Sequence, residues 1–228
     1  MNNKPRLGVI IVAAGKSERM GGVDKIFATL AGKTLLEWSV DTCQKCQLTQ
    51  QIVIVLDKDK LKMGQELAKR KTWSKVTAIC AGGHRRQDSV KEGLGRLSSC
   101  NWVMVHDGSR PFLTTDLIQR GIETAIENKG AAIAAIPVKD TIKLVNDLWA
   151  VVETLPRSLL WAAQTPQIFS FELITRAYET LTCEVTDDAS AIEQLGHSVG
   201  IYFGSYSNIK IDTPEDLISA EVLSLNMD

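Results

Sequence analysis

The 228-residue chain has no excess of charge of either sign, because 26 Lys and Arg are balanced by 27 Asp and Glu, for a formal net charge of −1. A basic excess is the usual mark of a nucleic-acid-binding protein, since such proteins gain affinity by releasing counterions from phosphates. The near-neutral balance therefore argues against a nucleic-acid partner. It does not argue against an anionic small molecule, which a few local cations can bind without altering the net charge.

The sequence also lacks a run of roughly 18 apolar residues, the length that a membrane-spanning helix needs. Its five cysteines are odd in number and scattered, at positions 43, 46, 80, 100 and 183. This pattern argues against a disulfide framework and favours a reducing compartment. We therefore expect a cytoplasmic protein without a membrane partner. No repeat or Pro/Gly/Ser-rich linker divides the chain, so we expect residues 1–228 to form a single domain.

What the sequence does contain is a regular alternation of short β-branched runs and helix-length amphipathic stretches. The strand candidates are Leu7–Ala14, Gln51–Leu56, Val76–Ala81, Trp102–His106, Gly130–Pro137 and Val199–Phe203, and the helix candidates are Thr34–Cys46, Lys58–Lys69, Asp88–Arg96 and Thr114–Glu127. Continuous Val/Ile strands separated by helices are typical of a mostly parallel sheet that is covered on both faces. The sequence therefore predicts a doubly wound α/β fold, in which ligands bind at the carboxyl ends of the strands.

Residues 138–161 interrupt this alternation. A turn-like pair, Asn146-Asp147, lies between two extended candidates, Thr141–Val145 and Trp149–Thr154. This arrangement predicts a β-hairpin that leaves the main body. From the pattern alone, an ordinary surface hairpin is the favoured interpretation.

The first predicted strand is followed by a glycine-rich loop, AAGKSERMGG at residues 13–22, with Lys25 close behind. Small residues let backbone N–H groups approach an anion closely, and Arg19 and Lys25 add positive charge at the same place. The loop suits a triphosphate, and a glycine-rich turn without a ligand is the competing interpretation. The Walker A and Gly-x-Gly-x-x-Gly patterns are both absent, which excludes the two commoner nucleotide loops.

Two further loops follow predicted strands. The pair Gly82-Gly83 precedes a helix start, which places free amides beside a ligand, although Asp88 or Ser89 could equally be a plain helix cap. Asp107 follows the fourth strand, with Arg110 three residues later. This pair is suited to holding a metal ion and a second anion, and a structural ion pair that fixes the loop explains the pattern equally well.

Near the C-terminus, Thr213-Pro214 with Asp216 forms a helix-start signal. Lys210 lies just before it, at an expected strand end, so its amine can point into the same crevice. Other chemically active residues favour structural roles. The Cys43-x-x-Cys46 pair lies on a helix rather than after a strand, and the three histidines lack metal-ligand spacing. No Gly-x-Ser-x-Gly nucleophile motif is present.

Taken in order, six motifs resemble those of the 2-C-methyl-D-erythritol 4-phosphate cytidylyltransferase family of the non-mevalonate isoprenoid pathway. They are AAGKSERMG followed by DK, GGHRRQDSV, VHDGSRP, VKDTIK, QTPQIF with TDDASAIE, and NIKIDTPEDL, and they run from about Leu7 to Leu223. The resemblance implies a Rossmann-like nucleotidyltransferase that joins CTP to the substrate's phosphate and releases pyrophosphate. It also implies a divalent cation, usually Mg²⁺.

The resemblance assigns roles to individual residues. To CTP it assigns Ala13, Ala14, Gly15, Lys16, Ser17, Gly83, Arg86 and Ser89. To the polyol phosphate it assigns Asp107, Arg110, Thr141, Thr165 and Thr186, with Asp107 also a candidate metal ligand. Its catalytic residues are Arg19, Lys25, Arg157 and Lys210. In the family the hairpin is an arm that interlocks a homodimer and carries Thr141 and Arg157 to the neighbouring site, which replaces the surface-hairpin interpretation.

The sequence departs from the usual family pattern beside several of these residues. The departures are Asp24, Ile26, His84, Gly108 and Ser109. They affect the details of nucleotide contact rather than the class of protein. Two alternatives stand beside this assignment: a cytidylyltransferase for another polyol phosphate, such as ribitol 5-phosphate, and a non-catalytic nucleotide-binding module. Retention of all four candidate cations and Asp107 counts against the second.

Overall fold

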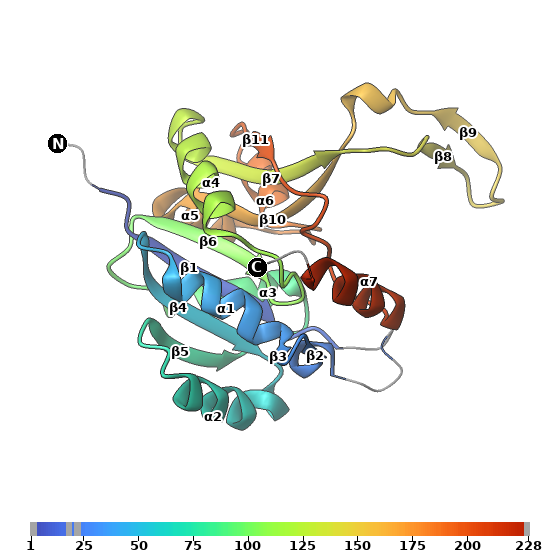
Figure 1. Cartoon of the computed structure of the whole chain (residues 1–228). Helices are drawn as coiled ribbons and strands as arrows, with labels where there is room; N and C mark the ends of the chain where they lie inside the picture. The colour runs from blue at the N-terminus through green and yellow to red at the C-terminus, as the bar shows by residue number, and fades with distance from the viewer. Residues whose placement is uncertain (1–3, 17–19, 21–23, 226–228) are drawn as a thin grey trace.

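The centre of the protein is a seven-stranded sheet, seen in a computed structural model that describes residues 4–16, 20 and 24–225. The strands are Leu7–Ala13 (β1), Thr29–Leu30 (β2), Lys33–Thr34 (β3), Thr49–Leu56 (β4), Val76–Ala81 (β5), Trp102–Asp107 (β6), Ala131–Pro137 (β7), Lys143–Val145 (β8), Val151–Thr154 (β9), Trp161–Ser170 (β10) and Gly200–Phe203 (β11). The sheet has the order β11–β7–β10–β6–β1–β4–β5 (Figure 1). Its neighbours pair in parallel except for β10, which is antiparallel to β6 and β7. The prediction of a mostly parallel sheet is confirmed.

Helices cover both faces of this sheet. On one face lie α1 (Leu35–Lys45), α2 (Leu61–Lys71) and α4 (Thr115–Glu127), and on the other lie α3 (Arg86–Leu94), α5 (Phe171–Thr180) and α6 (Asp188–Glu193). A smaller apolar cluster joins α7 (Pro214–Ser224) to β2. Short 3₁₀ turns occupy Lys25–Phe27 (η2), Lys58–Lys60 (η3) and Arg157–Leu159 (η4). No helix in the described ranges is long and apolar enough to cross a membrane. The doubly wound arrangement is confirmed.

β1 illustrates why a strand at the centre of the sheet is apolar along its whole length. Ile10 packs in the cluster beneath α3, whereas Val9 and Ile11 pack in the cluster beneath α1. Successive side chains of a strand point to opposite faces, so a strand between two helical layers buries both sets. In register, Ile10 lies beside Val53 of β4 and Val105 of β6.

Two helices begin at capping boxes that the sequence encodes locally. Before α1, the Glu37 N–H donates to the Thr34 hydroxyl and the Thr34 N–H donates to the Glu37 carboxylate. Thr213 and Asp216 make the same exchange before α7. Such boxes satisfy N–H groups that the first turn of a helix leaves without partners. The helix start expected at Thr213-Pro214 is confirmed.

Strands β8 and β9 form a hairpin that extends from the sheet, connected by β7 on one side and β10 on the other (Figure 1). At its tip the Asn146 N–H donates to the Ala150 carbonyl and the Trp149 N–H donates to the Asn146 carbonyl. The turn therefore falls where the Asn146-Asp147 pair predicts it. We call residues 138–161 the arm, and its protrusion confirms the hairpin expected there.

The structure differs from the sequence-based expectation in the C-terminal third. The predicted elements omit β10, α5 and α6. Lys210, expected at a strand end, lies instead in an irregular segment between β11 and α7. That residues 1–228 form a single domain stays a prediction.

Replacing Gly93 with Ala should destabilise the protein, because a Cβ at this position would lie 2.6 Å from Cγ2 of Ile10. Overpacking a close-packed core typically costs about 1–3 kcal/mol, so the midpoint of urea unfolding should fall. Gly95→Ala is the matched control, since its Cβ would meet no atom closer than 3.7 Å. Equal midpoints for Gly93→Ala and the unaltered protein would contradict the close contact of α3 with β1.

Candidate active site

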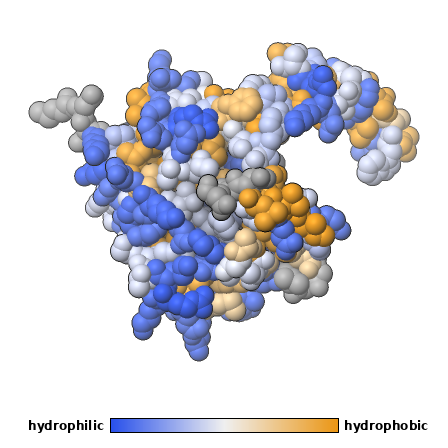
Figure 2. All heavy atoms as spheres, viewed as in Figure 1, coloured by the Kyte–Doolittle hydropathy of each residue, from blue (hydrophilic) through white to orange (hydrophobic). Residues whose placement is uncertain are grey.

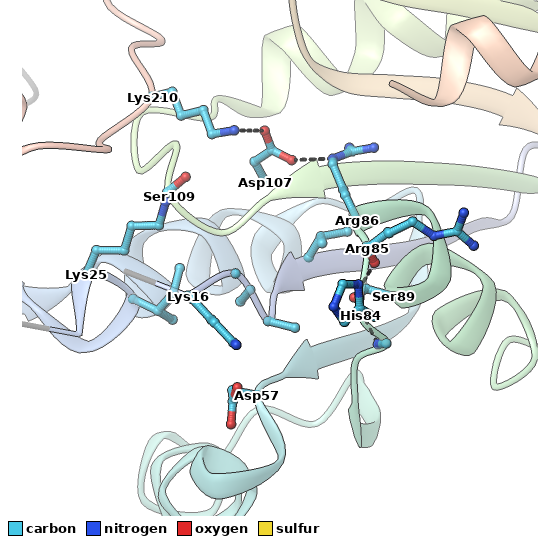
Figure 3. A pocket seen from close by; sticks show the side chains of 16 residues that line it. Lys16, Lys25, Asp57, His84, Arg85, Arg86, Ser89, Asp107, Ser109 and Lys210 are labelled. Atoms are coloured by element: carbon cyan, nitrogen blue, oxygen red, sulfur yellow. Dashed lines mark hydrogen bonds and ion pairs between the residues drawn. The ribbon is translucent and has the colours of Figure 1, made fainter. Parts of the chain in front are cut away.

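A crevice of about 490 Å³ opens at the carboxyl ends of β1, β5 and β6 (Figure 3). Its lining residues come from the ends of β1 and β6, from the loops after β1, β4, β5 and β6, from the first turn of α3, from η2 and from the segment before α7. They are Val12, Ala13, Ala14, Gly15, Lys16, Lys25, Ile26, Asp57, Gly83, His84, Arg85, Arg86, Ser89, Asp107, Ser109 and Lys210. Loops far apart in the sequence therefore meet at the sheet edge where the fold predicts a ligand site.

The loop after β1 contributes four of the residues assigned to CTP: Ala13, Ala14, Gly15 and Lys16 line the crevice. A Cβ added at Gly15 would meet no atom of the described residues within 4 Å. Backbone N–H groups in such a loop can be approached closely by an anion. Ser17 and Arg19 lie outside the described residues.

Lys25 begins η2 and lies against the segment that precedes α7. Its Nζ is 2.5 Å from Oδ1 of Asp212. The neighbouring acidic residue, Asp24, accepts a hydrogen bond from the Ile26 N–H at 3.0 Å and lies 3.4 Å from Nζ of Lys60. Asp24 thus caps η2 and pairs with a surface lysine, a structural role for this departure from the family pattern.

The loop after β5 packs directly on the loop after β1. A Cβ at Gly82 would lie 2.4 Å from Cβ of Ala14, and a Cβ at Gly83 would lie 2.3 Å from Cβ of Asp88. Only glycine fits such close approaches. The Ser89 hydroxyl accepts from the Gly83 N–H at 3.2 Å and donates to the Arg85 carbonyl at 3.3 Å, so it holds this loop on the first turn of α3.

Three cations converge on the buried carboxylate of Asp107. Nε of Arg86 lies 3.2 Å from Oδ1 and Nζ of Lys210 lies 3.4 Å from Oδ2 (Figure 3). Nε of Arg110 lies 3.9 Å from Oδ2. Burial acts to raise the pKa of Asp107, but Arg86, Lys210 and Arg110 outweigh it and hold that pKa far below its usual range. The carboxylate is therefore ionised at neutral pH.

Arg86 joins Asp107 to a second buried carboxylate. Its Nη2 lies 2.9 Å from Oδ2 of Asp188, whose Oδ1 accepts from the Tyr178 hydroxyl at 2.5 Å. Burial acts to lower the pKa of Arg86, and the two aspartates raise it above its ordinary value. Sequence reasoning assigns Arg86 to CTP and misses Tyr178 and Asp188, although Asp188 belongs to the TDDASAIE motif that carries part of the resemblance.

Arg110 turns toward the segment before α7. Its Nη1 donates to the Asn208 carbonyl at 2.7 Å, and burial lowers its pKa. Arg110 lies beside Asp107 but is not among the residues that line the crevice. The geometry of Arg110 is therefore consistent with both interpretations of the Asp107–Arg110 pair: an ion pair that fixes the loop, and a site that binds an anion.

Thr165 is buried beneath the crevice. Its hydroxyl accepts from the Asp107 N–H at 3.1 Å and lies 3.1 Å from Nδ1 of His106. Burial lowers the pKa of His106 to about 4, so the ring is neutral at pH 7. Thr186, assigned with Thr165 to the substrate, is exposed in the connection between α5 and α6.

The two arm residues assigned to the substrate are exposed, and the hairpin of β8 and β9 that they flank extends from the sheet (Figure 1). Thr141 precedes β8, and Arg157 begins η4, where its guanidinium donates to the Lys139 carbonyl at 2.5 Å. Neither lines the crevice of its own chain.

The described residues of the crevice do not form a metal cage of protein ligands alone. Within the described residues, no three His, Cys, Asp or Glu side chains are arranged to hold a metal ion. Mg²⁺ at nucleotide sites is usually held by one or two carboxylates together with substrate phosphates. Asp107, ionised and at the crevice wall, fits that second arrangement.

Comparison with known sequences matches residues 7–225 to the family model of IspD, 2-C-methyl-D-erythritol 4-phosphate cytidylyltransferase. The enzyme of that name from Dehalococcoides mccartyi (strain ATCC BAA-2266 / KCTC 15142 / 195) is 47% identical over 218 residues, which cover 96% of each chain. The enzyme of that name from Alkaliphilus oremlandii is 42% identical over 227 residues, which cover 97% of this chain and 96% of the relative.

Solved structures agree with these sequences. The 4-diphosphocytidyl-2C-methyl-D-erythritol synthase of Anaerococcus prevotii superposes with a TM-score of 0.85 at 30% identity and covers 97% of both chains. The 2-C-methyl-D-erythritol 4-phosphate cytidylyltransferase of Thermus thermophilus gives a TM-score of 0.77 at 32% identity over 96% of this chain and 99% of that one. Together with the ordered motifs and the crevice at the sheet edge, these matches show that the chain belongs to the 2-C-methyl-D-erythritol 4-phosphate cytidylyltransferase family.

Proposed function

We propose that the crevice is where this chain transfers the cytidylyl group of CTP to 2-C-methyl-D-erythritol 4-phosphate, giving 4-diphosphocytidyl-2-C-methyl-D-erythritol and pyrophosphate. The observation that carries this proposal is the charge of its wall, where five Lys or Arg side chains and two Asp side chains line a cavity beside a glycine-rich loop. Such a wall suits two polyanionic substrates. The names of the matched relatives favour methylerythritol phosphate over ribitol 5-phosphate.

The residue types agree with this reaction. A phosphate oxygen of the polyol phosphate attacks the α-phosphorus of CTP, and the bond to the bridging oxygen of pyrophosphate breaks. The attacking oxygen is already ionised at neutral pH, so no general base is needed. Negative charge accumulates around the α-phosphorus, and such transfers are catalysed mainly by positioning and by electrostatic stabilisation. Arg and Lys side chains supply both.

For CTP, we assign the triphosphate to the loop after β1, where Lys16 and Lys25 add charge to the backbone amides. The cytosine and ribose belong beside Gly83 and Ser89, because the loop after β5 presents its backbone to the same cavity. Ser17 and Arg19, assigned to the triphosphate by the resemblance, keep that role as proposals. Arg86, paired with two aspartates, contributes mainly by orienting Asp107.

For the polyol phosphate, we assign the neighbourhood of Asp107 and Lys210. Nζ of Lys210 lies 3.4 Å from the Asp107 carboxylate, so its amine lies at the crevice wall. A phosphate entering here would take over part of that interaction, while Arg110 supports the wall through Asn208. Thr165 and Thr186 remain assigned to the substrate side as proposals.

A divalent cation, Mg²⁺ in the first instance, fits this site when the nucleotide carries it, with Asp107 as the protein ligand. Once bound, it would neutralise part of the triphosphate charge and stabilise the departing pyrophosphate. The chain's own part is to present an ionised carboxylate, since Arg86, Lys210 and Arg110 hold the pKa of Asp107 low.

We further propose that the arm completes the site of a second copy of the chain. Its outer part exposes large apolar side chains, including Leu148 at 85% and Trp149 at 88% exposure, and Figure 2 shows hydrophobic residues gathered there. Contiguous exposed apolar surface of this kind marks an interaction site. An isologous homodimer would bury it and bring Thr141 and Arg157 to the partner's crevice.

The cytoplasmic location stays a prediction. All five cysteines are free thiols, and burial raises the pKa of Cys43 and of Cys80 above the usual value, which suits structural rather than redox roles.

The substrate assignment is tested by pyrophosphate release with CTP, Mg²⁺ and each candidate polyol phosphate in separate reactions. We expect release with 2-C-methyl-D-erythritol 4-phosphate and at most traces with ribitol 5-phosphate. Release with ribitol 5-phosphate alone would refute the assignment. Tight CTP binding without release from either substrate would favour the nucleotide-binding module.

Lys25→Ala should lower kcat by ~10²-fold or more, the scale of losing one preorganised charge that stabilises the transition state. Lys60→Ala is the matched control, because Lys60 pairs with Asp24 at the other side of η2 and is absent from the crevice wall. Steady-state kinetics of both variants check this. An unchanged kcat in Lys25→Ala would remove Lys25 from the chemistry.

The shared site predicts complementation between two inactive variants. Arg157→Ala lacks the arm cation and Lys25→Ala lacks the crevice cation, so a mixed dimer has one site with both. Mixing equal amounts, after dissociation and reassembly, should restore about a quarter of the activity, since half of randomly formed dimers are mixed. Failure of a mixture of proven dimers to regain activity would show that Arg157 does not act in the partner's site.

A further inference from the structure

His106 lies directly behind the crevice without lining it. The ring is fully buried at the end of β6, and the residue that follows it is Asp107. Its two nitrogens contact two other parts of the site: Nε2 lies 3.0 Å from the Arg110 carbonyl, and Nδ1 lies 3.1 Å from the Thr165 hydroxyl. One ring therefore joins β6, the loop after it and β10.

The direction of each hydrogen bond follows from counting protons. A carbonyl oxygen can only accept, so the single proton of the neutral ring lies on Nε2 and is donated to Arg110. Nδ1 then has only a lone pair, and the Thr165 hydroxyl must donate to it. The same hydroxyl accepts from the Asp107 N–H at 3.1 Å, so both of its roles are fixed.

We propose that His106 is a positioning residue for the reaction: it orients the Thr165 hydroxyl, which in turn holds the backbone of Asp107 and so places the carboxylate that gathers Arg86, Arg110 and Lys210. Ordered chains of hydrogen bonds fix their members more strongly than isolated pairs do. This inference rests on the proposed function, because it assigns the Asp107 side of the crevice to the polyol phosphate.

The irregular pairing of β10 supports this role. Its register with β7 shifts between Ala163 and Gln167, and Thr165 lies within that shift. Irregularities of this kind in a strand often direct a side chain at a functional site. Here the hydroxyl is directed across to β6, where it meets both His106 and Asp107.

Two substitutions separate the functions of the ring. His106→Gln retains a donor that can reach the Arg110 carbonyl but loses the acceptor for Thr165, whereas His106→Asn retains an acceptor near Nδ1. We expect His106→Gln and Thr165→Val each to raise KM for 2-C-methyl-D-erythritol 4-phosphate about tenfold, the effect of one buried hydrogen bond. KM for CTP should change by less than about twofold, and His106→Asn should recover most of the loss.

The double variant His106→Gln/Thr165→Val tests whether His106 acts through Thr165. Its KM should be no higher than that of the worse single variant, because both changes break one chain of contacts. Multiplied effects, or an equal rise in KM for CTP, would overturn the proposal. Thermal unfolding of each variant accompanies the kinetics. If His106→Gln does not fold, His106→Asn decides: this variant keeps an acceptor for the Thr165 hydroxyl, so a selective rise in its KM for the polyol phosphate would overturn the proposal.

Ser39→Ala is the matched control. The Ser39 hydroxyl, on the α1 side, lies 3.3 Å from the same Arg110 carbonyl that His106 contacts. Its loss should leave both KM values unchanged if Thr165 rather than this carbonyl transmits the effect. A selective rise in the polyol-phosphate KM of Ser39→Ala would overturn the proposal. Absence of pyrophosphate release by the unaltered protein would instead contradict the proposed function itself.

Discussion

The carboxylate of Asp107 partly offsets the positive charge of three side chains that meet at the carboxyl end of β6. Arg86, Arg110 and Lys210 would repel one another in the same small volume, and a buried charge without a partner is costly. The aspartate lets these cations gather where the sheet ends. Under the proposed function, substrate phosphates would share these cations with Asp107.

An irregular segment can present Lys210 at a fixed place because the residues around it are anchored. The buried Asn208 side chain donates to the Thr165 carbonyl at 2.8 Å, and the Ile211 N–H donates to the Ser109 carbonyl at 2.9 Å. Ile211 itself is fully buried in the small cluster beneath α7. Hydrogen bonds and the buried side chain of Ile211 thus hold this segment in place without regular secondary structure.

Sequence patterns predict the elements whose buried side chains are apolar, and they fail for elements that bury polar side chains. The apolar runs of β1 and β6 and the apolar face of α4 are recognisable in the sequence, and the turn residues Asn146-Asp147 predict the hairpin. β10 does not, because Gln164 and Gln167 occupy core positions that only their partners explain: Gln167 accepts from the Asp188 and Ala189 N–H groups. The pairing of Arg86 with Asp188 is hidden for the same reason, since the partners are about a hundred residues apart. Ordered motifs nominate candidate site residues, but they do not show which of those residues contact one another, as Arg86 and Asp107 do.

β10 runs without a break from Trp161 in the arm to Ser170 in the middle of the sheet. The strand that anchors the arm is therefore the strand that carries Thr165. A displacement of the hairpin would therefore act through one strand on the residues beneath the crevice. The position of the arm and the backbone contact of the buried Asp107 consequently depend on the same strand, β10.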